Sequence, residues 1–136
     1  DKLNQLRHIY FLKDLNGVME HMAKHRALLA PKFQTVIGRL ESELGGKGVA
    51  SWTNPNGGYF VSVDVLDGCA KRVVSLCKEA GGTLTGAGAT YPYGKDPNDR
   101  NIRVAPTYPP VAELEQAMEL FCICVQLAAA EKLLNK

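Results

Sequence analysis

Hydrophobic residues near the start of the chain recur every three or four positions, which is the spacing of one face of an α-helix. A short helix is predicted over residues 1–12, with the apolar stripe Leu3, Leu6, Ile9 and Tyr10. A longer helical pattern runs from about Val18 to Leu44. Pro31 lies inside this second pattern and predicts a kink, because proline lacks an amide donor and its ring crowds the preceding turn.

The middle of the chain changes to patterns that are typical of β-strands. Residues 49–52 and 58–65 are strand-like and flank a turn rich in Asn, Pro and Gly, which predicts an antiparallel hairpin. A helix is predicted from about Gly68 to Ala80, with Asp67 as its N-cap. Residues 83–85, Thr-Leu-Thr, are predicted to form a further short strand.

The last third of the chain begins with a strand pattern over residues 101–106. Side chains alternate along a strand, so Ile102 and Val104 should share one face while Arg103 points to the other. A long helix is predicted from about Val111 to Leu134, with the buried stripe Leu114, Met118, Phe121, Val125 and Ala128. The predicted fold class is α+β: a small, mainly antiparallel sheet covered by helices on one side and preceded by the long kinked helix.

Length and charge narrow the functional classes. The chain has 136 residues, enough for one domain with a modest core, and its net charge is only +2. So small a basic excess argues against nucleic acid as a partner. The longest apolar run, residues 121–130, is too short to span a bilayer, so no membrane partner is expected.

Cysteine usage favours a reduced, cytoplasmic protein. The four cysteines are Cys69, Cys77, Cys122 and Cys124, and they form no CxxC pair. They fall mainly in helical, partly apolar stretches, where cysteine serves as a small core residue. The chain begins at Asp1 and not at a methionine, which suggests a piece of a longer protein, although processing or a trimmed tag would give the same start.

Arg103 is the first candidate for chemistry. A guanidinium on a stiff strand, just after a turn-rich loop, can bind a carboxylate through two parallel charge-assisted hydrogen bonds. The alternative is an ordinary surface arginine on an edge strand, which is common in proteins. The residues by themselves therefore indicate a ligand-facing domain with one candidate anion-binding arginine.

Three other sequence patterns are weaker evidence for a functional site than Arg103 is. His21 and His25 are four residues apart on a predicted helix, but no third metal ligand can be named, so a solvated helix face is favoured over a metal site. Ser75 and Lys78 form an S-x-x-K pattern on the polar face of a helix, without the companion motifs of serine enzymes. The glycine-rich segments match neither GxGxxG nor a P-loop.

Several motifs, taken in order, resemble a known family. The motifs are Trp52 and residues 57–60, 77–81, 85–88 and 101–103. In this order they resemble the C-terminal small domain of fold type I pyridoxal-phosphate aminotransferases. Longer runs resemble a bacterial subgroup of aspartate aminotransferases, namely residues 7–14, 86–94 and 99–103. The likeness covers essentially the whole chain.

The resemblance implies roles for four residues. Arg103 would bind the α-carboxylate of the substrate, and Gly58 would lie where the small domain closes over it. Thr90 and Tyr91 would line the cleft. The substrates would be an amino acid such as aspartate and a 2-oxo acid, and the parent protein would be a homodimer.

The resemblance also implies what this chain lacks. In the family, the Schiff-base lysine and the main binding residues for pyridoxal 5'-phosphate belong to a separate large domain. Residues 1–136 would thus be a single C-terminal small domain, with a helical connecting segment over residues 1–44 and an α/β core over residues 45–136. The chain alone is predicted to hold neither catalytic nor cofactor-binding residues.

Two functions of other classes stay open at this stage. One is the ligand-sensing, aminotransferase-like domain of a transcription regulator, which would carry a DNA-binding region upstream. The other is a stand-alone binding module for small carboxylates, which would bind dicarboxylates unaided and lose affinity in Arg103→Ala.

Overall fold

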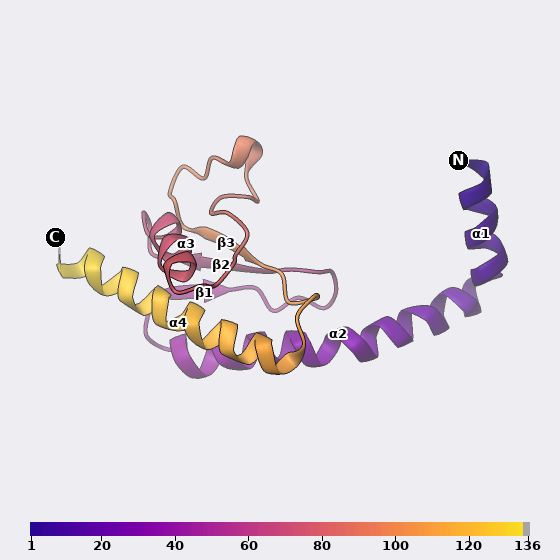
Figure 1. Ribbon diagram of the computed structural model, residues 1–136, viewed down its shortest axis with the longest axis horizontal. Helices are drawn as coiled ribbons and strands as arrows, with labels where there is room; N and C mark the ends of the chain where they lie inside the picture. The colour runs from indigo at the N-terminus through magenta and orange to yellow at the C-terminus, as the bar shows by residue number, and fades with distance from the viewer. Residues whose placement is uncertain (135–136) are drawn as a thin grey trace. The chain divides into compact units, whose positions relative to one another are not determined.

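The computed structural model describes residues 1–134. Within them lie four α-helices, three β-strands and one short 3-10 turn (Figure 1). Their contacts divide the chain into two units, residues 1–31 and residues 32–136. The division falls inside the second helix.

The first unit contains α1 (Lys2–Leu12) and the first part of α2 (Leu15–Leu44). The Asp1 carboxylate caps α1 by accepting hydrogen bonds from the amides of Leu3 and Asn4, at 3.1 and 3.4 Å. Asp14 does the same for α2, since its Oδ1 accepts from the amide of Gly17 at 3.0 Å. This cap explains why α2 begins at Leu15, a few residues earlier than its apolar pattern predicts.

α1 presents a largely exposed apolar surface within this unit. The four residues of its predicted stripe are between 59% and 86% exposed, namely Leu3, Leu6, Ile9 and Tyr10. α2 continues through Pro31 without a break in its helical assignment. Beyond that point Val36, Leu40 and Leu44 are buried and belong to the core of the second unit.

The second unit is built on a three-stranded antiparallel sheet in the order β1-β2-β3. The strands are β1 (Ala50–Trp52), β2 (Val61–Val65) and β3 (Asn101–Val104). Val61, Val63 and Val65 of β2 point into the core, and the residues between them lie on the other face. The predicted hairpin and the predicted alternation in β3 are confirmed, although β2 begins at Val61 and not at Gly58.

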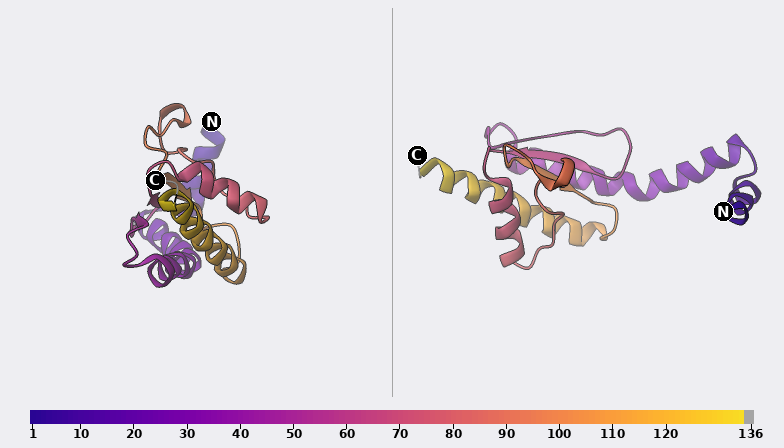
Figure 2. Two further views of the ribbon diagram at one scale, coloured as in Figure 1. Left: turned by 90° about the vertical axis from the view of Figure 1, so that its left-hand side faces the viewer. Right: turned by 90° about the horizontal axis from the view of Figure 1, so that it is seen from above.

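Helices cover the apolar face of this sheet, as predicted. α4 (Val111–Leu134) lies beside the last part of α2 (Figure 1), and Gln126 donates a hydrogen bond to the carbonyl of Glu43 at 3.4 Å. α3 (Ala70–Glu79) packs on α4 (Figure 2), and Arg72 and Glu131 form an ion pair at 2.8 Å between the two helices. The whole predicted stripe of α4 is buried, with Phe121 only 1% exposed. Over residues 1–134, no helix combines the length and the apolar character needed to cross a membrane.

Two predictions about local structure are wrong. Asp67 does not cap α3, whose N-cap position is Cys69. The first turn of α3 is instead bonded to Asp99, whose carbonyl accepts from Ala70 at 2.8 Å and whose carboxylate accepts from Lys71 at 3.2 Å. Residues 83–85 form no strand and pair with none of the three strands. The chain beyond them contacts β3 through one bond, from the amide of Gly88 to the carbonyl of Asn101 at 3.0 Å.

Candidate functional site

Arg103 lies on the polar face of the sheet. In β3 its neighbours Ile102 and Val104 are buried in the core, with 0% and 4% exposure, while Arg103 is half-buried on the opposite face. Ser62 of β2 is its cross-strand partner. The alternation of the strand therefore places the guanidinium on the face that the helices do not cover.

The Arg103 guanidinium rests on an aromatic ring and has an unused donor. Its central carbon lies 4.3 Å from the centroid of the Phe60 ring, within the range of a cation–π contact. Its Nε is shielded from solvent and has no hydrogen-bond partner among the described residues. A buried donor without an acceptor is costly. The Nε of Arg100 is buried without a partner as well.

Nearby carboxylates are already engaged elsewhere. Asp64 and Asp67 both face Arg100, at 3.3 and 3.7 Å from its guanidinium nitrogens. Asp96 accepts hydrogen bonds from the amides of Arg100 and Asn101, at 2.7 and 2.8 Å. None of the ion pairs found in residues 1–134 includes Arg103. Arg103 thus has no carboxylate partner among the described residues.

The Asp96 carboxylate stabilises the loop before β3 by accepting hydrogen bonds from backbone amides. Partial desolvation opposes ionisation of its carboxyl, but hydrogen bonds from the amides of Arg100, Asn101 and Asn98 outweigh it and hold its pKa below the ordinary value. The carboxylate is therefore charged at neutral pH. It stabilises the turn that delivers the chain into β3.

The other predicted site residues lie on segments that approach the same face. The Thr90 hydroxyl donates to the Asn101 side-chain oxygen at 2.5 Å, and Asn101 precedes Arg103 by two residues on β3. Tyr91 follows Thr90 and is 36% exposed. Gly58 has a φ of 92° and open space around it, two residues before Phe60. No hydrogen bond or ring contact is found between Arg103 and these three residues.

Sequence reasoning missed Phe60 and Asn101. Both could have been found from the period of two along a strand, because Phe60 stands two residues before Ser62 and Asn101 two residues before Arg103. A polar residue at position 101 that shares the face of a candidate ligand-binding arginine is a usable signal. The network of hydrogen bonds around Asn101 could not have been read from sequence.

The described lysines are either exposed or bonded to backbone carbonyls. Lys32 and Lys132 are half-buried, but their ammonium groups are bonded to backbone carbonyls, of Thr107 at 2.7 Å and of Asp67 respectively. The other lysines within residues 1–134 are exposed.

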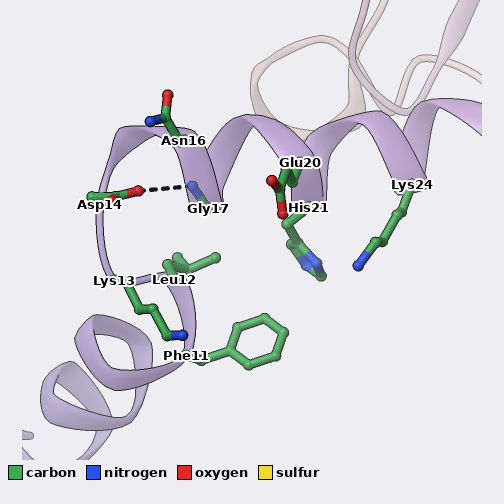
Figure 3. A pocket seen from close by; sticks show the side chains of 9 residues that line it. All are labelled: Phe11, Leu12, Lys13, Asp14, Asn16, Gly17, Glu20, His21 and Lys24. Carbon is green, nitrogen blue, oxygen red and sulfur yellow. Dashed lines mark hydrogen bonds between the residues drawn. The ribbon is translucent and has the colours of Figure 1, made fainter.

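The first unit contains a hollow of its own. It lies between the end of α1 and the start of α2 and is lined by residues such as Phe11, Glu20, His21 and Lys24 (Figure 3). The His21 ring packs edge-on to Phe11 at 5.3 Å and lies 4.5 Å from the ring of His25. Across residues 1–134, no group of three or more His, Cys, Asp or Glu residues could hold a metal ion.

All four cysteines are free and buried, in agreement with the sequence prediction of core thiols. Burial raises the pKa of Cys77 to about 12 and that of Cys122 to about 11. Because the thiolate is the reactive form, both side chains should be inert at neutral pH.

We predict that the cysteines of the native protein resist alkylation. At pH 8, a rise in the pKa of Cys77 from the ordinary 9.0 to about 12 lowers its thiolate fraction roughly a thousandfold. Iodoacetamide followed by peptide mapping should find no label at Cys77 or Cys122 until denaturant is added. The folded protein keeps these thiols protonated while the unfolded chain ionises, so their contribution to stability is present below about pH 9 and is lost as the pH rises toward about 12. Fast labelling of the native protein, at the rate of a short peptide containing Cys122, would contradict this assignment.

The fold occurs in aminotransferases. A solved α-aminoadipate aminotransferase of Thermus thermophilus matches 94% of this chain with a TM-score of 0.75 at 19% identity, which is a likeness of fold alone. A solved aspartate transaminase of Corynebacterium glutamicum matches 96% of this chain with a TM-score of 0.94 at 54% identity. The sequence profile of the aspartate amino-transferase family matches residues 1–136. The chain belongs to the aspartate aminotransferase family.

The chain spans about a third of the length of its relatives. The aspartate aminotransferase of Corynebacterium glutamicum is 53% identical over 135 residues, which are 99% of this chain and 31% of that protein. The solved transaminase from the same organism is covered to 31% as well. The family membership and the α+β fold are therefore established for this chain, and the activity of a whole enzyme is a separate question.

Proposed function

We propose that this chain is the C-terminal small domain of a pyridoxal-phosphate-dependent aminotransferase that moves the amino group of aspartate to 2-oxoglutarate. The proposal is supported by membership of the family and by 53% identity to a relative named aspartate aminotransferase. In this proposal the domain closes over the substrate, and Arg103 binds the α-carboxylate.

One observation carries the role of Arg103: an arginine on the uncovered face of the sheet without an ion pair among the described residues. Its Nε is hidden from solvent and lacks an acceptor, while Phe60 supports the flat face of the guanidinium. The edge of the guanidinium stays available, and a carboxylate can accept two parallel hydrogen bonds from its N–H groups. Binding is strengthened where closure of a domain excludes water.

The remaining parts of the enzyme are proposed to lie outside this chain. Pyridoxal phosphate supplies an electron sink when bound, and its lysine and phosphate ligands would come from a large domain. We further propose a cytoplasmic homodimer. The buried free thiols support a reducing compartment, because disulfides form in oxidising ones.

The test is kinetic and uses the full-length gene product. Transamination should be measured for aspartate and for alanine in the wild type and in Arg103→Ala. Loss of a charged hydrogen-bond partner should lower kcat/KM by about a hundredfold or more. The loss should be similar for both amino acids, because the α-carboxylate is common to them. Arg72→Ala is the matched control, since Arg72 pairs with Glu131 between α3 and α4 and should leave kcat/KM unchanged.

The other outcomes each reject a part of the proposal. A loss confined to aspartate would move Arg103 to the side-chain carboxylate. Unchanged kinetics in Arg103→Ala would make it a surface residue. No transamination with any amino acid would favour the regulator or the binding module, and calorimetry with a dicarboxylate such as succinate, in the wild type and in Arg103→Ala, would then test the binding module.

A further inference from the structure

Asn101 is the only buried polar or charged residue among those described, with 7% exposure. Its side-chain amide donates to Ser62 Oγ at 2.9 Å and to Asp64 Oδ1 at 2.7 Å. Its side-chain oxygen accepts from the Thr90 hydroxyl at 2.5 Å. Both amide hydrogens and the oxygen are therefore used, so the network is complete and allows a single orientation of the side chain.

This network reaches the residue directly opposite Arg103. Ser62 is the cross-strand partner of Arg103. Asn101, two residues before Arg103 on β3, donates a hydrogen bond to the Ser62 hydroxyl. The backbone of Ser62 is fixed as well, because its amide donates to Thr53 Oγ1 at 3.1 Å. Arg103 thus lies across from Ser62 and two positions from Asn101 on the same strand, while Phe60 packs against its guanidinium.

The loop before β3 is held by the same residue. Besides the Thr90 hydroxyl, the amide of Gly88 donates to the Asn101 carbonyl at 3.0 Å, and the Asn101 amide donates to Asp96 at 2.8 Å. Thr90 is a part of this loop and its hydroxyl is engaged by Asn101. A hydroxyl has a single proton, so in this bond Thr90 has no hydrogen left to donate to a substrate.

We infer that Thr90 and Asn101 are positioning residues, which fix the loop of residues 86–99 on β3 and hold Arg103 in the orientation that binds a carboxylate. Thr90 then influences substrate binding only through Arg103. This inference rests on the proposed function. It differs from the expectation that Thr90 lines the cleft as a direct contact.

The experiment is a double-mutant cycle on the full-length enzyme with aspartate as the varied substrate. Thr90→Val removes the hydroxyl at nearly constant volume and leaves the buried Asn101 oxygen without its donor. We expect KM for aspartate to rise about tenfold and kcat to change less than about twofold. The reason is that the carboxylate is then bound less tightly in the ground state and in the transition state alike. Thr90→Ser keeps the hydroxyl and should stay within about twofold of the wild type. Thr83→Val, at an exposed threonine in the preceding segment, is the control that should change neither constant.

The decisive step is Thr90→Val in the Arg103→Ala background. If Thr90 acts through Arg103, the second substitution should change KM by less than about twofold, since coupled residues are non-additive. A further tenfold rise would mean that Thr90 contacts the substrate on its own, and would overturn the inference. A lowered melting temperature of Thr90→Val with an unchanged KM would also overturn it, because the bond would then serve the loop alone.

The two proposals fail in different ways. A large effect of Arg103→Ala with no effect of Thr90→Val would leave the carboxylate role of Arg103 intact and reject the positioning role. An Arg103→Ala enzyme with wild-type kinetics would reject both. Ser62→Ala offers a second variant with little risk of misfolding, and it should raise KM in the same direction as Thr90→Val, because Asn101 loses one of its two acceptors.

Discussion

Replacement of Phe121 by alanine should lower the free energy of unfolding of the 136-residue chain by about 3–5 kcal/mol. Phe121 is 1% exposed and is among the largest fully buried side chains in the described residues. It lies in α4 within the core that also contains β2, β3 and the end of α2. Alanine would leave a cavity that close-packed neighbours can fill only in part. Urea denaturation at neutral pH measures the loss as a shift in the midpoint.

Ile123 provides the matched control for this prediction. It stands two residues away on α4 and is 55% exposed. Ile123→Ala should change the free energy of unfolding of the chain by no more than about 0.5–1 kcal/mol. If Ile123→Ala were as damaging as Phe121→Ala, the assignment of the buried face of α4 would be wrong.

Replacement of Gly88 by alanine should cost about 2–4 kcal/mol of stability and should also disturb the loop that carries Thr90. Gly88 has a φ of 75°, a left-handed conformation that is unfavourable for residues with a Cβ. A Cβ there would lie 2.9 Å from the carbonyl oxygen of Gly94 and 3.2 Å from the amide nitrogen of Asp96. Both are backbone atoms, so the turn would have to move. Urea denaturation of the chain and KM for aspartate in the full-length enzyme should both report the change.

Gly86 supplies the comparison within the same loop. A Cβ at Gly86 would meet nothing within 4 Å, and its φ is outside the left-handed range. Gly86→Ala should therefore alter the free energy of unfolding by less than about 0.5 kcal/mol. Equal effects of the two substitutions would show that composition, and not the geometry at Gly88, governs the loop.

Local pattern was enough to predict most of the fold. The apolar period of α4 predicted its bounds and its buried stripe, because helical periodicity is decided by which residues must leave water. The alternation Ile102, Arg103, Val104 predicted which side chain of β3 faces away from the core. In both elements the local preference and the packing agree, so the sequence alone was sufficient.

Prediction failed where bonds connect residues far apart in the chain. Asp67 was predicted to cap α3 because it is near the helix in sequence, yet Asp99 bonds to the first turn after the chain has folded back. Residues 83–85 have strand propensity but pair with no strand of the sheet. Strand formation depends on a partner, and a partner is supplied only by the tertiary structure.

The sequence by itself determined the fold class, the family resemblance and the choice of Arg103 as the candidate carboxylate-binding residue. Only the tertiary structure revealed that Phe60 supports this arginine, that the neighbouring carboxylates are engaged by Arg100 and by backbone amides, and that Thr90 is bonded to Asn101. The physical reason is the range of the interactions. Hydrophobic periodicity is a property of residues close together in the sequence. A hydrogen-bond network forms only when folding brings donors and acceptors of distant segments within about 3 Å of one another.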